Sequence, residues 1–133
     1  MALLWSLDSS QHLVTVTAEG DVTRADIETY LSEIERSNAI DWRKLVDLRE
    51  ARMVLTEDDV LAIGLIFRQA DASGDVGALA VVLPTSEPER AMRLLGFLAA
   101  AKRPMRLFKT IAPARRWVKT TPSPRLSPKG RGA

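Results

Sequence analysis

KLVDLREARMVLTEDDVLAIGLIF, residues 44–67, passes directly from a short apolar strand into a helix. Three of its first five residues, Leu45, Val46 and Leu48, are apolar, which favours a strand buried at the centre of a sheet. The helix is expected from about residue 56 to 71, beginning at Thr56 among acidic side chains. A buried strand followed at once by a helix indicates an α/β fold, because this unit builds parallel sheets.

The segments on either side continue this alternation. Residues 3–7 and 13–20 are β-rich runs that enclose the turn sequence DSSQ, and they predict a hairpin. A helix is expected after Thr23, with a core stripe formed by Ile27, Tyr30, Leu31 and Ile34. The rest of the chain predicts a strand at 78–83, a helix from about 85 to 102 with Met92 in the core, a strand at 105–108 and a helix at 112–118.

The order of these elements is ββαβαβαβα. It predicts a mixed sheet of four or five strands that is parallel at its centre and carries about four helices. Residues 119–133 are rich in Pro, Ser, Gly and basic side chains, with a single Leu. They cannot bury enough apolar area to offset the entropy of ordering, so we expect a disordered basic tail.

Charge is distributed unevenly along the chain. Residues 1–89 carry a net charge of −10, whereas residues 90–133 carry +12 and contain no acidic residue. A basic final third can contact nucleic acid, anionic lipid or an acidic partner. The simpler expectation is that the two parts neutralise each other within the fold.

Catalytic constellations are missing from the sequence. There is no cysteine, His12 is the only histidine, and no phosphate-binding glycine motif or nucleophile elbow is present. The N-terminal sequence MALLWSLDSSQ has no basic region and too short an apolar run for a signal peptide. We therefore expect a cytoplasmic, non-enzymatic protein with no cofactor, no metal and no catalytic residue.

Several motifs in a fixed order resemble the SpoIIAA-like (STAS/SEC14-like) branch of the STAS domain superfamily. They are EGDVTRADIETYLSEIE, KLVDLRE, TEDDV, ALAVVLPTSEPERAMRLLGF and MRLFKTIAPARRWV. The resemblance covers residues 3 to about 118 and implies a SpoIIAA-like STAS domain over residues 1–118. It further implies a mixed sheet with helices, no established catalytic role, and binding of ligands or partners, with lipid or membrane association proposed.

Thr56 occupies the position at which anti-sigma-factor antagonists of this superfamily carry a phosphorylatable serine. The Asp-Ser-Ser-Gly-type motif itself is absent, and Glu57, Asp58 and Asp59 follow the hydroxyl instead. Thr56 is a good N-cap, and Asp59 completes a capping-box-like start. Helix capping is the favoured interpretation, with a phospho-switch at Thr56 as the alternative.

Asp47 lies on an apolar strand and is followed closely by two arginines. It is either an acid–base group with a shifted pKa or a carboxylate paired with Arg49 or Arg52, and the pairing is favoured. Arg49 and Arg52 also lie just before a helix N-terminus, where anions are stabilised. They form a candidate anion site.

Two helices carry more apolar residues than a core stripe requires. Leu61 and Leu65 fall on the charged arc of their helix, and Phe97 falls between Arg90 and Arg93. Leu61, Leu65, Arg93 and Phe97 are therefore the candidate partner or ligand surface. It suits a homodimer or protein partner, a small lipid-like ligand, or an anionic membrane surface. A fully packed helical layer with a few exposed apolar residues is the structural alternative.

Nucleic acid ranks below these partners. Trp117 lies beside Arg115, Arg116 and Lys119, and an aromatic ring among cations can stack on bases. Packing of Trp117 in the core explains the same pattern more simply. Weak binding through the basic C-terminal third is therefore a second alternative.

Overall fold

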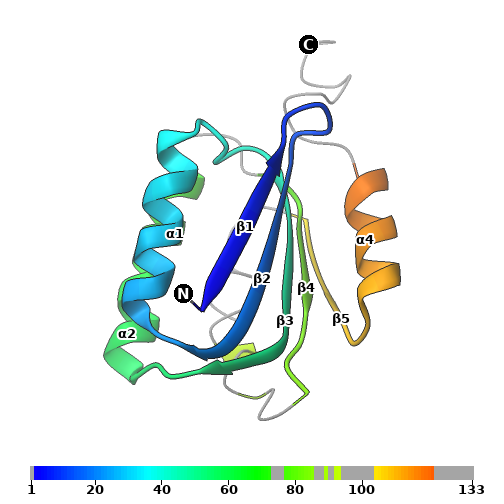
Figure 1. Ribbon diagram of the computed structural model, residues 1–133. Coiled ribbons are helices and arrows are strands. Elements are labelled where there is room, and N and C mark those ends of the chain that lie inside the picture. Colours follow the sequence, from blue (N-terminus) through cyan, green and yellow to red (C-terminus); the bar gives the residue numbers. More distant parts are fainter. Residues whose placement is uncertain (1, 73–76, 86–88, 90–91, 94–103, 122–133) are drawn as a thin grey trace.

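A five-stranded sheet with helices on both faces forms the fold (Figure 1). The computed structural model describes residues 2–72, 77–85, 89, 92–93 and 104–121. The strands are β1 (Leu3–Asp8), β2 (Leu13–Val22), β3 (Arg43–Met53), β4 (Leu79–Val82) and β5 (Met105–Phe108). The helices are α1 (Arg24–Arg36), α2 (Glu57–Ala72) and α4 (Ile111–Thr120).

The strands lie in the order β1-β2-β3-β4-β5. β1 and β2 form an antiparallel hairpin, and the pairs β2–β3, β3–β4 and β4–β5 are parallel. The prediction of a mixed sheet with a parallel centre is confirmed. Three helices are present in the described residues, and most of the helix expected at 85–102 lies outside them. Of the tail expected at 119–133, residues 119 and 120 belong to α4, and residues 122–133 lie outside the described part.

Helices α1 and α2 cover one face of the sheet (Figure 1). The expected stripe of α1 buries Ile27, Tyr30 and Ile34, whereas Leu31 is only partly buried. From α2, Val60 packs in the same core. Removal of this apolar surface from water is the main contribution to holding both helices on the sheet.

A register change in β3 keeps its apolar side chains on this face. The change falls between Thr17 and Glu19 of the neighbouring β2, where β3 contains one extra residue. A bulge shifts the alternation of side chains by one position. As a result Leu48, Ala51 and Met53 are all buried in the core beneath α1 and α2.

Helix α4 covers the opposite face and is fastened at its C-terminus by Arg43. A smaller apolar cluster, Leu13, Leu45, Ala80, Val82, Ala114 and Val118, lies between α4 and the sheet. Nη1 of Arg43 lies 3.2, 2.9 and 3.3 Å from the carbonyl oxygens of Val118, Lys119 and Thr121. Nη2 donates to the carbonyl of Gln11 in the hairpin turn. One guanidinium therefore joins the start of β3, the hairpin turn and the end of α4.

Lys44 and Gly77 shape the entry to the two central strands. The buried ammonium of Lys44 donates to the carbonyl oxygens of Ala39, Ile40 and Trp42, at 3.1, 2.7 and 2.7 Å. A Cβ at Gly77 would lie 2.4 Å from the carbonyl carbon and oxygen of Trp42. The loop after α1 is thus held by a charged side chain on one side and by close backbone packing on the other.

Candidate binding surface on helices α1 and α2

Helix α2 begins with a reciprocal pair of hydrogen bonds. The Thr56 backbone N–H donates to the Asp59 carboxylate at 3.0 Å, and the Asp59 N–H donates to Thr56 Oγ1 at 3.1 Å. The bond from the Thr56 N–H, with smaller contributions from the Thr56 side chain and from Arg24, holds the pKa of the Asp59 carboxylate below its usual value. The predicted capping role of Thr56 is confirmed. Its phosphorylation stays a prediction.

Helix α2 carries apolar side chains on both of its faces, but only those of one face are covered. Val60 and Ile63 are 5% and 0% exposed in the core, whereas Leu61 and Leu65 are 50% and 58% exposed. Residues four apart in a helix are neighbours on its surface, so the two leucines form a continuous leucine row. An unpartnered row of this kind is the feature of α2 that packing within the described chain does not explain.

Arg93 lies beside the first turn of α2. Its guanidinium forms an ion pair with Glu57, and both side chains are more than half exposed. Met92 is 49% exposed, so the expectation that it faces the core is wrong. Phe97 and Arg90 lie outside the described residues.

A groove of about 520 Å³ runs between α1 and α2. Its lining comprises Glu28, Leu31, Ser32, Glu35, Ile40, Ile66 and Gln69. Gln69 lines the groove and is four residues beyond Leu65 on α2. The leucine row is therefore adjacent to the side of the groove that α2 forms. At the start of both helices Arg24 bridges them, through ion pairs with Glu28 at 3.1 Å and Asp59 at 3.6 Å.

The groove was not predicted from the sequence. The helical pattern assigns Leu31 to the core stripe, and that assignment treats α1 alone. Which residues line a space between two helices depends on how the helices pack, and periodicity within one helix does not contain that information. The extra apolar residues of α2, Leu61 and Leu65, were the only sequence signal for a binding surface on the α1–α2 side of the sheet.

Arg49 and Arg52 lie away from this surface, on β3, and each is bound by an aspartate. Arg49 forms a bidentate pair with Asp47, at 3.0 and 2.8 Å, and Arg52 forms one with Asp21, at 2.8 and 3.0 Å. Hydrogen bonds from Arg49 hold the pKa of Asp47 below its usual value, aided by the charges of Arg49 and Arg115, while burial opposes the shift. The expected pairing of Asp47 with Arg49 is confirmed; an anion at these arginines would have to compete with both carboxylates.

The described part of the chain offers no cluster of three or more histidine or carboxylate side chains placed to hold a metal ion. Within that part, every helix is also too short or too polar to cross a bilayer.

A solved structure shares this arrangement of strands and helices. It is the crystal structure of an uncharacterized protein of the DUF3478 family from Shewanella loihica PV-4, described as having a SpoIIAA-like fold. The two proteins align with a TM-score of 0.58 and 19% sequence identity, over 88% of this chain and 94% of the other. No protein-family model and no curated protein matches the chain.

The chain is therefore an α/β domain with a SpoIIAA-like fold, as its sequence motifs predict. At 19% identity the likeness establishes the fold alone, and a function has to be argued from the surface of this chain.

Proposed function

We propose that this chain is a non-catalytic binding domain that engages a protein partner through the leucine row of α2 and the adjoining groove. The observation that carries the proposal is the exposure of Leu61 and Leu65, at 50% and 58%, on the same side of α2. Burial of two leucines against a partner removes apolar surface from water and stabilises a complex. The groove beside them, with Leu31, Ile40 and Ile66 in its lining, extends the apolar contact.

The character of the groove favours a protein over a membrane or a small apolar ligand. Glu28 and Glu35 line it, and carboxylates repel an anionic bilayer. Pockets for small ligands usually enclose most of the ligand, whereas this groove lies open between two surface helices. An apolar strip with a polar rim is the usual arrangement of a protein interface.

Site-specific crosslinking tests the proposal. A photo-reactive amino acid in place of Leu65 should give a discrete covalent adduct with another protein in cells of the host, and Leu61→Glu should abolish that adduct. Leu4 on β1 is the matched control, because it is an equally exposed leucine, at 59%, on a different element. The same amino acid placed there should not yield that adduct.

Light scattering and native mass spectrometry distinguish a homodimer from a domain that binds a lipid-like ligand. If the partner is a second copy of the chain, purified protein at micromolar concentration should be dimeric and Leu65→Glu should make it monomeric. A retained lipid-like molecule, without any adduct at Leu65, would favour a ligand-binding domain instead and would contradict the proposal. Adducts of equal yield from Leu65 and Leu4 would also contradict it.

A further inference from the structure

The last strand and helix present a face that is entirely basic in its charge. Residues 104–121 contain five cationic residues and no acidic one, and all five are exposed: Arg106, Lys109, Arg115, Arg116 and Lys119. We call these residues the α4–β5 basic face. They come from β5, from the turn that follows it and from α4.

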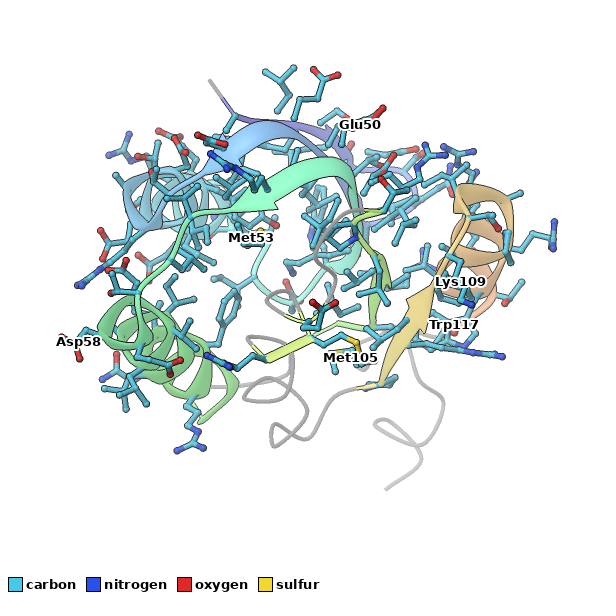
Figure 2. The ribbon with its side chains drawn as sticks, turned by 90° about the horizontal axis from the view of Figure 1, so that it is seen from below. Glu50, Met53, Asp58, Met105, Lys109 and Trp117 are labelled. Carbon is cyan, nitrogen blue, oxygen red and sulfur yellow. The ribbon has the colours of Figure 1, made fainter. Side chains whose placement is uncertain are left out.

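Within the described residues, no ion pair links the five cations of this face to an acidic side chain. Every ion pair among the described residues joins an acidic residue to Arg24, Arg36, Arg49, Arg52 or Arg93. The acids of α1 and α2 lie across the sheet from α4; Figure 2 shows Asp58 on one side of the molecule and Lys109 and Trp117 on the other. The expected neutralisation is therefore not made by ion pairs at these residues, although Asp47 lies near Arg115.

One carboxylate does lie near the face, but another arginine already holds it. Asp47 is close enough to Arg115 for that charge to lower its pKa. Its two oxygens, however, accept the bidentate bonds from Arg49. Arg115 therefore stays available to an anion in solution.

Two aromatic rings lie among these cations. The guanidinium of Arg106 lies 5.4 Å from the ring centre of Phe108, and that ring lies 6.1 Å from Trp117. Both rings are partly buried and pack on the small core beneath α4. Within residues 104–121, Leu107 of β5 is the one large apolar side chain among the exposed ones, at 36%, and helix α4 contributes none. A membrane-binding helix needs such a side chain to insert, so the face suits a hydrated polyanion better than a bilayer.

We propose that the α4–β5 basic face binds the phosphate backbone of a nucleic acid without reading its sequence. Lysine and arginine side chains contact phosphates and release the counterions condensed on the nucleic acid. The face is also well anchored, because Arg43 holds the last carbonyl groups of α4 and the apolar cluster holds its inner side. This inference is independent of the leucine row, which lies on the other side of the sheet.

Fluorescence anisotropy with a labelled 20-nucleotide single strand and the corresponding duplex tests the proposal on the full chain. Binding should weaken steeply with salt: five phosphate contacts to a single strand predict roughly a hundredfold loss of affinity between about 50 and 200 mM. The double variant Arg116→Ala/Lys119→Ala should bind roughly tenfold more weakly, with a salt slope shallower by about 1.4, because two contacts are lost.

The matched control removes the same charge from the other side of the molecule. Arg36 and Arg68 are exposed on α1 and α2, and Arg36→Ala/Arg68→Ala should leave affinity and salt slope unchanged. Equal weakening by both double variants would mean that binding follows net charge and would overturn the proposal. So would a lack of binding by the unaltered protein at low salt.

Two further measurements test whether residues 122–133 bind the nucleic acid instead, and whether the basic face binds membranes. A triple variant, Arg125→Ala/Lys129→Ala/Arg131→Ala, should retain most of the binding. If the triple variant lost binding while Arg116→Ala/Lys119→Ala kept it, nucleic-acid binding would belong to residues 122–133. That result would overturn the proposal. Flotation with vesicles of phosphatidylserine and phosphatidylcholine should recover little protein; recovery there, without oligonucleotide binding, would assign the face to membranes.

Discussion

Nη1 of Arg43 lies 2.9 Å from the carbonyl oxygen of Lys119, a residue 76 positions further along the chain. The last carbonyl groups of a helix have no partners within the helix, and they carry its negative dipole end. A guanidinium satisfies several of them at once, because its donors are fixed in a fork. Arg43 therefore holds α4 on the sheet by electrostatic contact in addition to apolar packing.

Replacement of Arg43 by alanine should lower the free energy of unfolding by about 3 kcal/mol, because carbonyl groups of α4 and of the hairpin turn lose a charged donor. Urea denaturation followed by circular dichroism measures the change. Arg36→Ala is the control: the Arg36 side chain is 77% exposed and its pair with Glu33 is superficial, so stability should hardly change. Equal stability of the two variants would contradict the role given to Arg43.

The two bidentate Arg–Asp pairs should differ in their effect on stability. In one pair the Asp47 side chain is 15% exposed, whereas in the other Asp21 and Arg52 are 57% and 60% exposed. Asp47→Asn should cost about 1 kcal/mol at pH 7, after allowance for solvent screening. Asp21→Asn, the matched control, should cost clearly less, because water competes for both partners.

The effect of Asp47→Asn should also depend on pH in a definite direction. The pKa of Asp47 is lowered in the folded protein, so its contribution is fully present above the unfolded pKa, near 4. That contribution is lost as pH falls through the lower, folded value. The stability gap between the natural protein and the variant should thus be constant from about pH 7 to 5 and shrink progressively below about pH 4. A gap that does not shrink as pH falls from about 4 to 2 would contradict this account.

Thr56 should contribute to stability through its hydroxyl. Thr56→Ala removes the acceptor for the Asp59 N–H and should cost about 1 kcal/mol, whereas Thr56→Ser keeps the acceptor and should cost little. Thermal unfolding of the three proteins measures both effects. An alanine variant as stable as the serine variant would show that the capping bond contributes nothing.

The switch hypothesis for Thr56 makes a separate prediction. If a kinase acts on this residue, protein isolated from its host should contain phosphothreonine at position 56. A phosphate there would be stabilised by the helix dipole but repelled by the acidic side chains of the first turn. Mass spectrometry that finds only unmodified Thr56 under varied growth conditions would argue against a switch.

The local patterns of the sequence predicted much of the fold. The apolar run at 44–48 proved to be the start of the central strand β3, and Thr23 begins α1 with the expected capping box. These features depend on neighbours within a few residues. The length of β3 was underestimated, because its second half alternates only after the bulge and therefore does not read as one continuous strand.

The candidate surfaces were predicted less completely, because they depend on contacts between distant segments. The exposure of Leu61 and Leu65 follows from helical periodicity within α2, and the sequence predicted it. The groove depends on the packing of α1 against α2. The hydrogen bonds from Arg43 to the last carbonyl groups of α4 depend on the position of α4 on the sheet. The separation of charge across the sheet likewise depends on which face each helix covers, which the order of elements alone does not determine.

Gly77 gives a landmark for tracing relatives of this chain. The atoms that would obstruct a side chain there belong to the backbone at Trp42, so the constraint comes from the path of the chain and is independent of the side chain at residue 42. Any descendant that keeps this path should keep a glycine before its fourth strand, however far the rest has diverged. Alignments too distant for overall identity to guide them can be anchored at that single position.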